Sequence, residues 1–498
     1  MTRSTHRGPK LLEHSISRRL LLRGSASLVA GGLAALGQRF PARAAAAAST
    51  KLIIDRRTIE VLGKAASVFG IRQADGTPGL TLDTGARFEV DVVNNAGEDV
   101  IIHWHGQRPP YIQDGIADAN RPLIKNGATQ AYNYAATPGT HWMHSHHLLQ
   151  EQALMAAPLV VRSADDARLD VQDVTVLLHD FSYRNPAEIL EGLTKGRLPA
   201  HDTAGMNMAD KTASGGMAGM KMDGMAMDGD LNDVAYDAFL ANDRTLDDPS
   251  VVRTERNGKV RLRLINGAAS SAFWIDLGQI AGKLIAVDGI PVEPFLGSRF
   301  PLSMGQRLDV LVDVPTGRSV PILAQVEGKR ERTGFILVAG GTPVKKISGL
   351  AQAACNALDL SLEMQLRSLL APSVRAADLN LEMAITGSMS PYSWSINNQA
   401  WPNVDRPVIK LGQRVVIEMT NQTMMAHPMH LHGHHFQVIG INGKKIAGAV
   451  RDTVLVPPSG SVKIAFDADN PGRWPLHCHN LYHMAAGMMT ELVYDRFA

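Results

Sequence analysis

Cysteine is nearly absent from this sequence of 498 residues, which contains only Cys355 and Cys478. A scaffold held by many disulfides is therefore excluded, and the fold must depend on a hydrophobic core. Aromatic residues are also few, at 5% of the chain, whereas hydrophobic residues make up 45%. The length suits two to four domains.

The chain also lacks an excess of either charge, since its formal net charge is +2. Beyond the N-terminal segment no basic footprint is evident, so we expect no nucleic-acid partner. No apolar run reaches the roughly 20 residues that a membrane-spanning helix needs. We therefore expect no membrane span in the mature chain.

The N-terminal segment has the features of an export signal. Arg18 and Arg19 precede a short apolar stretch, and small residues around Ala44 offer cleavage sites. This pattern resembles a twin-arginine signal, and we expect residues 1–46 to be removed and the protein to be periplasmic or otherwise exported. Without residues 1–45 the chain has 42 basic and 47 acidic residues, a net charge of −5.

A threefold repeat runs along the rest of the sequence. In two copies a glycine, an asparagine and a histidine follow one another at intervals of nine residues: Gly85, Asn94 and His103, and Gly412, Asn421 and His430. The middle copy has Asn266, but Ile275 and Leu277 stand at the two histidine positions. Alternating apolar runs between such turns indicate antiparallel strands. The repeat predicts three β-sandwich domains, the middle one without metal.

The composition places the expected boundaries. We expect domain 1 at 47–165, domain 2 at 166–345 and domain 3 at 376–498. Residues 346–375 are expected to form a linker with a short helix. Within domain 2, residues 204–230 are rich in glycine, alanine, aspartate and methionine. They lack periodicity and are expected to form a loop.

Eight histidines occur as four His-x-His pairs. They are His103 and His105, His144 and His146, His430 and His432, and His477 and His479. Residues i and i+2 of a strand share a face, so each pair can direct two imidazoles to one side. One such pair alone would be ordinary surface sequence. Four pairs, two from each outer domain, predict a multinuclear metal cluster between these domains.

A second metal site is indicated next to the first. Cys478 lies between His477 and His479 and therefore points to the opposite face of its strand. His427 precedes His430 by three residues, and His483 and Met488 follow Cys478. Two imidazoles, a thiolate and a weak thioether form the ligand set of blue copper. Structural zinc is a poorer interpretation, because it uses four ligands in one closed site.

These four motifs resemble the multicopper oxidase family over most of the mature chain. The resemblance implies three cupredoxin-like Greek-key β-sandwich domains, an all-β fold, and four copper ions of types 1, 2 and 3. It implies that type 1 copper binds His427, Cys478 and His483 with Met488 axial, and type 2 copper His103 and His430. The implied type 3 ligands are His105, His144, His146, His432, His477 and His479. The implied reaction reduces dioxygen to water, with Cys478 conducting electrons and Asp114 a candidate proton relay.

Within the family, the chain is most similar to bacterial copper-resistance oxidases. The segments around His427 and His483 carry this similarity, together with seven methionines between Met206 and Met227. Thioethers favour Cu(I), so oxidation of Cu(I) is the first expectation for the substrate. Two acids typical of related enzymes are missing, because Thr423 and the segment Met484-Ala485-Ala486 stand in their places.

Two other functions are compatible with the sequence. One is laccase-like oxidation of phenols as the small reducing substrate. The other is a non-catalytic periplasmic copper-binding or electron-transfer protein, which would not need eight cluster histidines. We expect the protein to act as a monomer.

Overall fold

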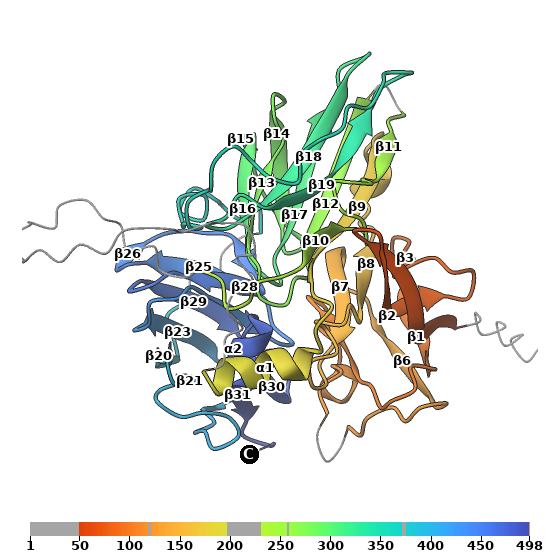
Figure 1. Cartoon of the computed structure of the whole chain (residues 1–498). Coiled ribbons are helices and arrows are strands. Elements are labelled where there is room, and N and C mark those ends of the chain that lie inside the picture. Colours follow the sequence, from red (N-terminus) through yellow and green to blue (C-terminus); the bar gives the residue numbers. More distant parts are fainter. Residues whose placement is uncertain (1–48, 118–120, 197–230, 256–257, 371–374, 498) are drawn as a thin grey trace, which may run out of the picture. The chain divides into compact units, whose positions relative to one another are not determined.

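A computed structural model of the chain describes residues 49–117, 121–196, 231–255, 258–370 and 375–497. The expected signal peptide and the methionine-rich segment 204–230 both lie outside these residues. The regular secondary structure of the described part is almost all β-strand, as expected for an all-β protein (Figure 1). Its sheets form three sandwiches, which we call the first, second and third in chain order.

The first sandwich has two four-stranded sheets, ordered β2-β1-β4-β6 and β3-β8-β7-β5. Its core includes Phe88, Val90 and Val92, which alternate with half-exposed residues along β4. This alternation is what a strand with one face against a core requires. The strands are β1 (Thr50–Val61), β2 (Lys64–Gln73), β3 (Leu80–Leu82), β4 (Arg87–Asn94), β5 (Ile102–His105), β6 (Thr129–Ala135), β7 (Gly139–Ser145) and β8 (Ala156–Val161).

The second sandwich pairs a sheet ordered β10-β9-β12-β17-β14-β15 with one ordered β11-β19-β18-β13-β16. Ile275 and Leu277, at the histidine positions of the repeat, are buried in its core. The strands are β9 (Gln172–Phe181), β10 (Ala238–Ala241), β11 (Val251–Arg253), β12 (Lys259–Asn266), β13 (Phe273–Asp276), β14 (Gly282–Val287), β15 (Ile290–Gly297), β16 (Arg299–Leu302), β17 (Arg307–Asp313), β18 (Ser319–Val326) and β19 (Arg332–Val338).

The third sandwich pairs a sheet ordered β21-β20-β23-β29-β25-β26, with β27 beside β25, and one ordered β22-β31-β30-β24-β28. Its strands are β20 (Leu379–Met389), β21 (Tyr392–Ile396), β22 (Val408–Ile409), β23 (Arg414–Asn421), β24 (His427–Leu431), β25 (Phe436–Ile441), β26 (Lys444–Lys445), β27 (Val450–Arg451), β28 (Thr453–Val456), β29 (Ser461–Asp467), β30 (Arg473–Cys478) and β31 (Met489–Tyr494).

The repeated asparagine has one structural role in all three sandwiches. Asn94, Asn266 and Asn421 are buried at the ends of β4, β12 and β23. The Oδ1 atom of each accepts the backbone N–H two residues ahead, and Nδ2 donates to backbone carbonyls of the following turn. The side chain thereby satisfies backbone groups that leave the ladder. The equal spacing in the sequence thus reflects equal turns in the fold.

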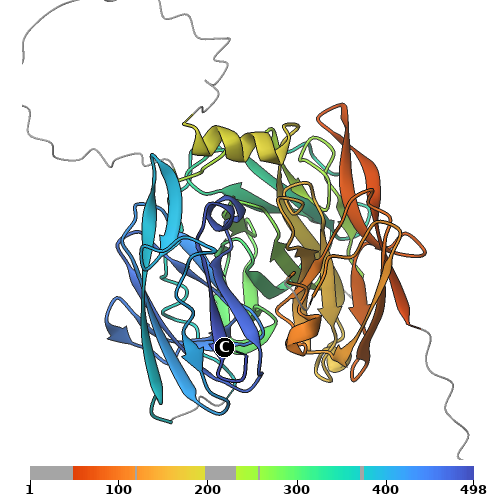
Figure 2. The ribbon, with the colours of Figure 1, turned by 90° about the horizontal axis from the view of Figure 1, so that it is seen from below.

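The two α-helices lie beside the third sandwich. They are α1 (Pro186–Thr194), which contacts β21 and is seen from another side in Figure 2, and α2 (Leu481–Ala485), which follows β30. Two short 3-10 helices are η1 (Tyr111–Gln113) and η2 (Asp166–Arg168). Among the described residues, no helix has the length and apolar character needed to cross a membrane.

The segment expected to link domains 2 and 3 follows the second sandwich closely. Glu293 N donates to Arg367 O, and Leu358 N donates to the side chain of Glu327. The short helix expected here is wrong for the described residues 346–370, which contain a turn at 361–365 but no helix. The turn has local hydrogen bonds, such as Met364 N to Leu360 O, and other backbone groups of the segment bond to the second sandwich.

Candidate metal centres

Strand register brings the histidine pairs together. In the first sandwich β5 pairs with β7, which places His103 opposite His144. In the third sandwich β24 pairs with β30, which places His430 opposite His477. All eight histidines of the four pairs meet where these sheets face one another. Three groups of three have their ring nitrogens within 4.8 Å of one another: His103, His105 and His430; His105, His144 and His479; and His146, His432 and His477.

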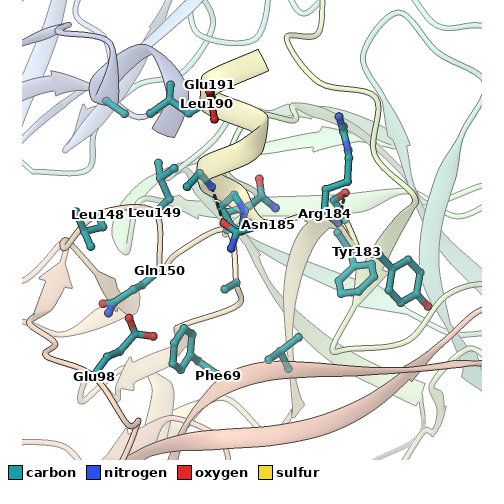
Figure 3. Close-up of a pocket in the computed structure, with 18 of the residues that line it drawn as sticks. Phe69, Glu98, Leu148, Leu149, Gln150, Tyr183, Arg184, Asn185, Leu190 and Glu191 are labelled. Atoms are coloured by element: carbon teal, nitrogen blue, oxygen red, sulfur yellow. Dashed lines mark hydrogen bonds between the residues drawn. The ribbon is translucent and has the colours of Figure 1, made fainter. Parts of the chain in front are cut away.

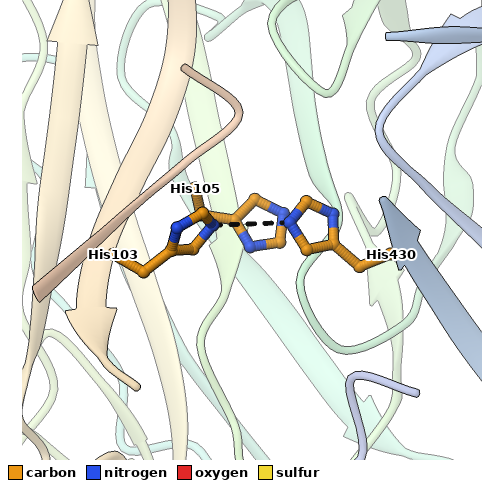
Figure 4. Close-up of side chains that lie close together, drawn as sticks. All are labelled: His103, His105 and His430. Atoms are coloured by element: carbon orange, nitrogen blue, oxygen red, sulfur yellow. Dashed lines mark hydrogen bonds between the residues drawn. The ribbon is translucent and has the colours of Figure 1, made fainter. Parts of the chain in front are cut away.

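The ring nitrogens inside the cluster are unusually close. His103 Nε2 and His430 Nε2 are 3.4 Å apart, with His105 beside them (Figure 4). His432 Nε2 and His477 Nε2 are only 2.9 Å apart. His103 and His430 belong to different sandwiches, and His432 follows β24 whereas His477 lies on β30.

The other ring nitrogens show which protonation state the cluster has. His477 Nδ1 donates to Cys478 O at 2.8 Å, and His432 Nδ1 donates to Asp114 Oδ2 at 2.9 Å. Because these acceptors hold the ring hydrogens, the inner Nε2 atoms of both rings carry bare lone pairs. Two lone pairs facing each other at 2.9 Å repel unless a cation lies between them. The residues present therefore fit metal ions.

Burial keeps the imidazoles in the ligand form. It lowers the pKa of His105, His144, His432 and His479 well below the usual value, and neighbouring positive charges lower it further. Burial also lowers the pKa of His477 to about 4. Neutral imidazole is the form that binds metal, so the cluster is ready to take up ions at neutral pH.

A separate site surrounds Cys478. Its Sγ atom lies 3.7 Å from both His427 Nδ1 and His483 Nδ1, and these two nitrogens are 3.0 Å apart. Met488 is fully buried, and its backbone oxygen accepts from Cys478 N at 3.1 Å. Burial raises the pKa of the Cys478 thiol, so a nearby cation is needed to hold it as the thiolate. The donor set is that of blue copper.

Several residues that contact the histidines are not among the site residues predicted from the sequence. Asp233 Oδ1 accepts from His483 Nε2 at 3.1 Å, and Thr423 Oγ1 lies 2.7 Å from His427 Nε2. Glu151 Oε2 lies 2.6 Å from His144 Nδ1. Asp452 Oδ1 lies 3.0 Å from His105 Nε2. These contacts orient the rings, which is the usual role of residues behind metal ligands.

Asp114 lies in the cluster, at the place that the sequence predicts. It follows η1, is fully buried, and accepts from His432 with Oδ2. Its backbone oxygen accepts from His103 Nδ1 at 2.9 Å. Oδ1 has no hydrogen-bond partner among the described residues. Gly115 has φ +84°, and a Cβ atom there would lie 1.8 Å from Ile102 O, so only glycine allows this close approach.

Three cavities adjoin the metal centres. One is a cleft of about 1280 Å³ under α1, lined by Leu149 and Tyr183 (Figure 3) and by His146, Trp401 and Met484 among others. A second, of about 420 Å³, is also lined by His146. The smallest of the three, of about 40 Å³, is lined by Met304, Met425 and Glu327 and by the two neighbours of His427. Burial raises the pKa of Glu327 to about 7. The large cleft can admit organic molecules, whereas the small one fits an ion or a water molecule.

Comparison with known proteins identifies the same family in each of the three sandwiches. Multicopper oxidase family models match residues 54–166, 172–336 and 375–497. The multicopper oxidase MmcO of Mycobacterium tuberculosis is 31% identical over 424 residues, which cover 84% of this chain and 81% of that protein. Copper resistance protein A of Escherichia coli is 26% identical, covering 84% and 88%.

Solved structures agree on the fold. Fet3p, described as a multicopper oxidase that functions in iron import, superposes with a TM-score of 0.73 at 18% identity and covers 90% of each chain. The laccase of Botrytis aclada gives a TM-score of 0.70 at 22% identity, covering 90% of this chain and 87% of that one. The three sandwiches are thus cupredoxin-like. This chain belongs to the multicopper oxidase family, whose members bind copper and oxidise their substrates with dioxygen as the electron acceptor.

Proposed function

We propose that this multicopper oxidase oxidises Cu(I) in copper tolerance and that it does so outside the cytoplasm. The copper-resistance relatives support the role. The twin-arginine-like N-terminus supports the location. The observation that favours Cu(I) as the substrate is the cavity beside His427, which is lined by two thioethers and one carboxyl group.

We assign the copper ligands as the motifs predict, and the grouping of ring nitrogens supports this assignment. His103 and His430 bind type 2 copper. The site around Cys478 would bind type 1 copper through His427, Cys478 and His483, with Met488 as a further ligand. The type 3 pair is held by His105, His144 and His479 on one side and by His146, His432 and His477 on the other.

The domain boundaries remain our proposal: 47–165, 166–345 and 376–498, with a linker at 346–375. The first and third domains supply all the ligands. The second domain supplies none, but it lies against the metal centres at Met304, Glu327 and Asp233. We also propose that the protein is a monomer.

Copper bound at these sites would supply one-electron redox chemistry, so that four electrons from the substrate together with four protons would reduce one dioxygen to two waters. The chain contributes the path and the environment. Cys478 is joined to His477 and His479 by single peptide links, which gives a short covalent route between the two centres. Asp233 and Thr423 hold the outer nitrogens of His483 and His427. We propose that Asp114 passes protons to the cluster through Oδ1, which has no hydrogen-bond partner among the described residues and lies 3.5 Å from His103 Nδ1.

The chemistry of the small cavity fits Cu(I). Met304 and Met425 are at most 6% exposed, and Ser303 Oγ lies 3.9 Å from the Met304 sulfur. Glu327 accepts from Leu358 N at 2.6 Å with one carboxyl oxygen. Thioethers bind Cu(I) in preference to zinc or calcium, and a carboxylate balances the charge. Met425 lies two residues before His427, so an ion in this cavity is close to the type 1 site.

The double substitution Met304→Leu with Met425→Leu tests the substrate. We expect kcat/KM for Cu(I) to fall about 10-fold or more, because soft ligands are replaced by apolar groups of similar volume. We expect oxidation of a phenol to change by less than about 2-fold, since the ligands of the copper sites are untouched. Oxygen consumption with each substrate measures both effects.

A matched control is Met383→Leu with Met419→Leu, which alters two methionines in the core of the third sandwich. This pair is expected to leave both activities unchanged. If the wild-type protein does not oxidise Cu(I), or if both double variants lose Cu(I) oxidation equally, the Cu(I) assignment is wrong.

Copper content tests the ligand assignment. We expect about four coppers per chain after full loading, because the ligands form one type 1 set and one set for three ions. Elemental analysis together with protein quantification measures this ratio. A ratio of one copper or fewer would leave only a carrier protein, which is the non-catalytic alternative.

Oxidation of phenols is the second candidate function. The laccase of Neurospora crassa is 25% identical over 483 residues, which supports this alternative. The cleft of about 1280 Å³ (Figure 3) also has room for an aromatic molecule, and its lining residues include Met484, which follows His483 in the sequence. A kcat/KM for a phenol far above that for Cu(I) would favour this function.

A further inference from the structure

One of the eight cluster histidines is turned around. His103, His144, His430, His432 and His477 all use Nδ1 for their contacts outside the cluster. His105 instead directs Nε2 outward, to Asp452, while its Nδ1 lies 3.2 Å from His479 Nε2 inside the cluster. The ring therefore needs the opposite tautomer, with the hydrogen on Nε2 and the lone pair on Nδ1.

Asp452 is held so that it can only accept at His105. Arg307 donates to both of its oxygens, at 2.7 Å to Oδ1 and 2.5 Å to Oδ2. Thr453 Oγ1 donates to Oδ1 at 2.9 Å. A carboxylate in a two-pronged ion pair with a guanidinium group is ionised and has no hydrogen to donate. The hydrogen between Asp452 and His105 therefore belongs to His105 Nε2.

Arg307 joins all three sandwiches at this point. Besides Asp452 in the third, it donates to Thr140 O in the first, and to Gly305 O and Asp288 O in the second. All five N–H groups of the guanidinium are thus used, and the side chain is completely buried. These hydrogen bonds hold the guanidinium group in one position, and the guanidinium group in turn holds the carboxylate of Asp452.

Two glycines show how closely this part of the second sandwich approaches the cluster. A Cβ atom on Gly106, which has φ +87°, would lie 2.4 Å from an Arg307 nitrogen. A Cβ atom on Gly305, with φ +78°, would lie 2.7 Å from the ring of His479 and 3.1 Å from that of His105. No other residue fits at either position without displacing a cluster histidine or its support.

We propose that Asp452, clamped by Arg307 of the second sandwich, is a positioning residue that fixes His105 in the Nε2–H tautomer, so that Nδ1 is the atom presented to copper. The copper-free domain thereby sets the geometry of one side of the type 3 pair. This inference depends on the proposed role of His105 as a type 3 ligand.

The substitution Asp452→Asn tests this proposal. Both oxygens of Asp452 accept hydrogen bonds, whereas the amide of asparagine has one oxygen that accepts and one nitrogen that donates. It cannot satisfy both Arg307 and His105, so the tautomer of His105 is no longer fixed. We expect the affinity for copper at the His105 side to fall about 10- to 100-fold. Competition with a copper chelator measures the affinity. Electron paramagnetic resonance should show a new signal from type 3 copper that has lost its magnetic coupling.

A second variant covers the possibility that Asp452→Asn does not fold. Arg307→Lys keeps the charge but loses the two-pronged geometry, and we expect the same changes at smaller size. The control is Asp309→Asn, which breaks a buried ion pair of the second sandwich with Arg261 away from the histidines. This control should keep the copper affinity and the spectrum of the wild type.

The outcomes separate the inference from the proposed function. If the wild type holds fewer than about four coppers, the ligand assignment itself fails. If the wild type is fully loaded, and every variant that folds binds copper as the wild type does without a new signal, the positioning role of Asp452 is wrong. The same holds if Asp309→Asn causes an equal loss, because the effect is then one of general stability.

Discussion

Replacing Cys478 with serine is expected to abolish the blue absorption and the oxidase turnover while the histidine cluster keeps its copper. Cys478 Sγ lies 3.7 Å from both type 1 histidine nitrogens, and a thiolate gives the strong charge-transfer band of blue copper. Serine is nearly isosteric, but its hydroxyl is a hard and weakly basic ligand. The path from the type 1 site to His477 and His479 therefore loses its first atom.

The measurements are the visible spectrum, oxygen consumption and copper content, which should fall by about one ion per chain. The other cysteine offers a matched control. Cys355 is half-buried and contacts Val326 O at 2.9 Å, far along the chain from the copper motifs. Cys355→Ser should retain both colour and turnover. Blue absorption that persists in Cys478→Ser would contradict the type 1 assignment.

The substitution Asp114→Asn is expected to lower turnover about 100-fold while the blue absorption remains. Asp114 is the buried carboxylate between His432 and His103, and its Oδ1 atom has no hydrogen-bond partner among the described residues. An amide can still contact His432, but it cannot accept and release a proton. Reduction of dioxygen to water consumes protons, so the loss should appear in turnover and not in the colour.

Stopped-flow reduction of the blue copper by substrate and steady-state oxygen consumption separate the two effects. We expect normal reduction of the type 1 site and slow reoxidation. Asp83→Asn is a suitable control, because Asp83 is an exposed acid of the same sandwich, and its ion pair in the described part of the chain is with Arg162 on the surface. Wild-type turnover in Asp114→Asn would remove Asp114 from the proton route.

The parts of the site that could be predicted from the sequence are those that local geometry determines. A strand alternates its side chains, so His477 and His479 must share a face and Cys478 must take the other. The spacing between Asn94 and His103, repeated between Asn421 and His430, gives equal turns because the asparagine performs the same bonding in each. The all-β fold follows from the same alternation.

The parts that could not be predicted depend on residues brought together by the tertiary fold. Asp233 and His483 are separated by 250 positions, and Asp452 and His105 by 347. Neither acid lies in a motif, and nothing around it indicates a histidine partner. The sequence indicates Thr423 only as a position where related enzymes have an acid. In the structure its hydroxyl contacts His427 directly. The expected linker helix is absent from the described residues, because the segment makes only one turn with local hydrogen bonds and its other backbone groups bond to the second sandwich.

The cluster joins residues that are far apart in the sequence, and this has a consequence for how the protein is made. His103 and His430 are 327 residues apart, and His105 and His479 are 374 apart. Such contacts close late in folding, because the entropy of a long loop must be overcome before the contact is gained. During synthesis the first sandwich can fold while its histidines still have no partners. The complete cluster cannot accept copper until almost the whole chain has left the ribosome.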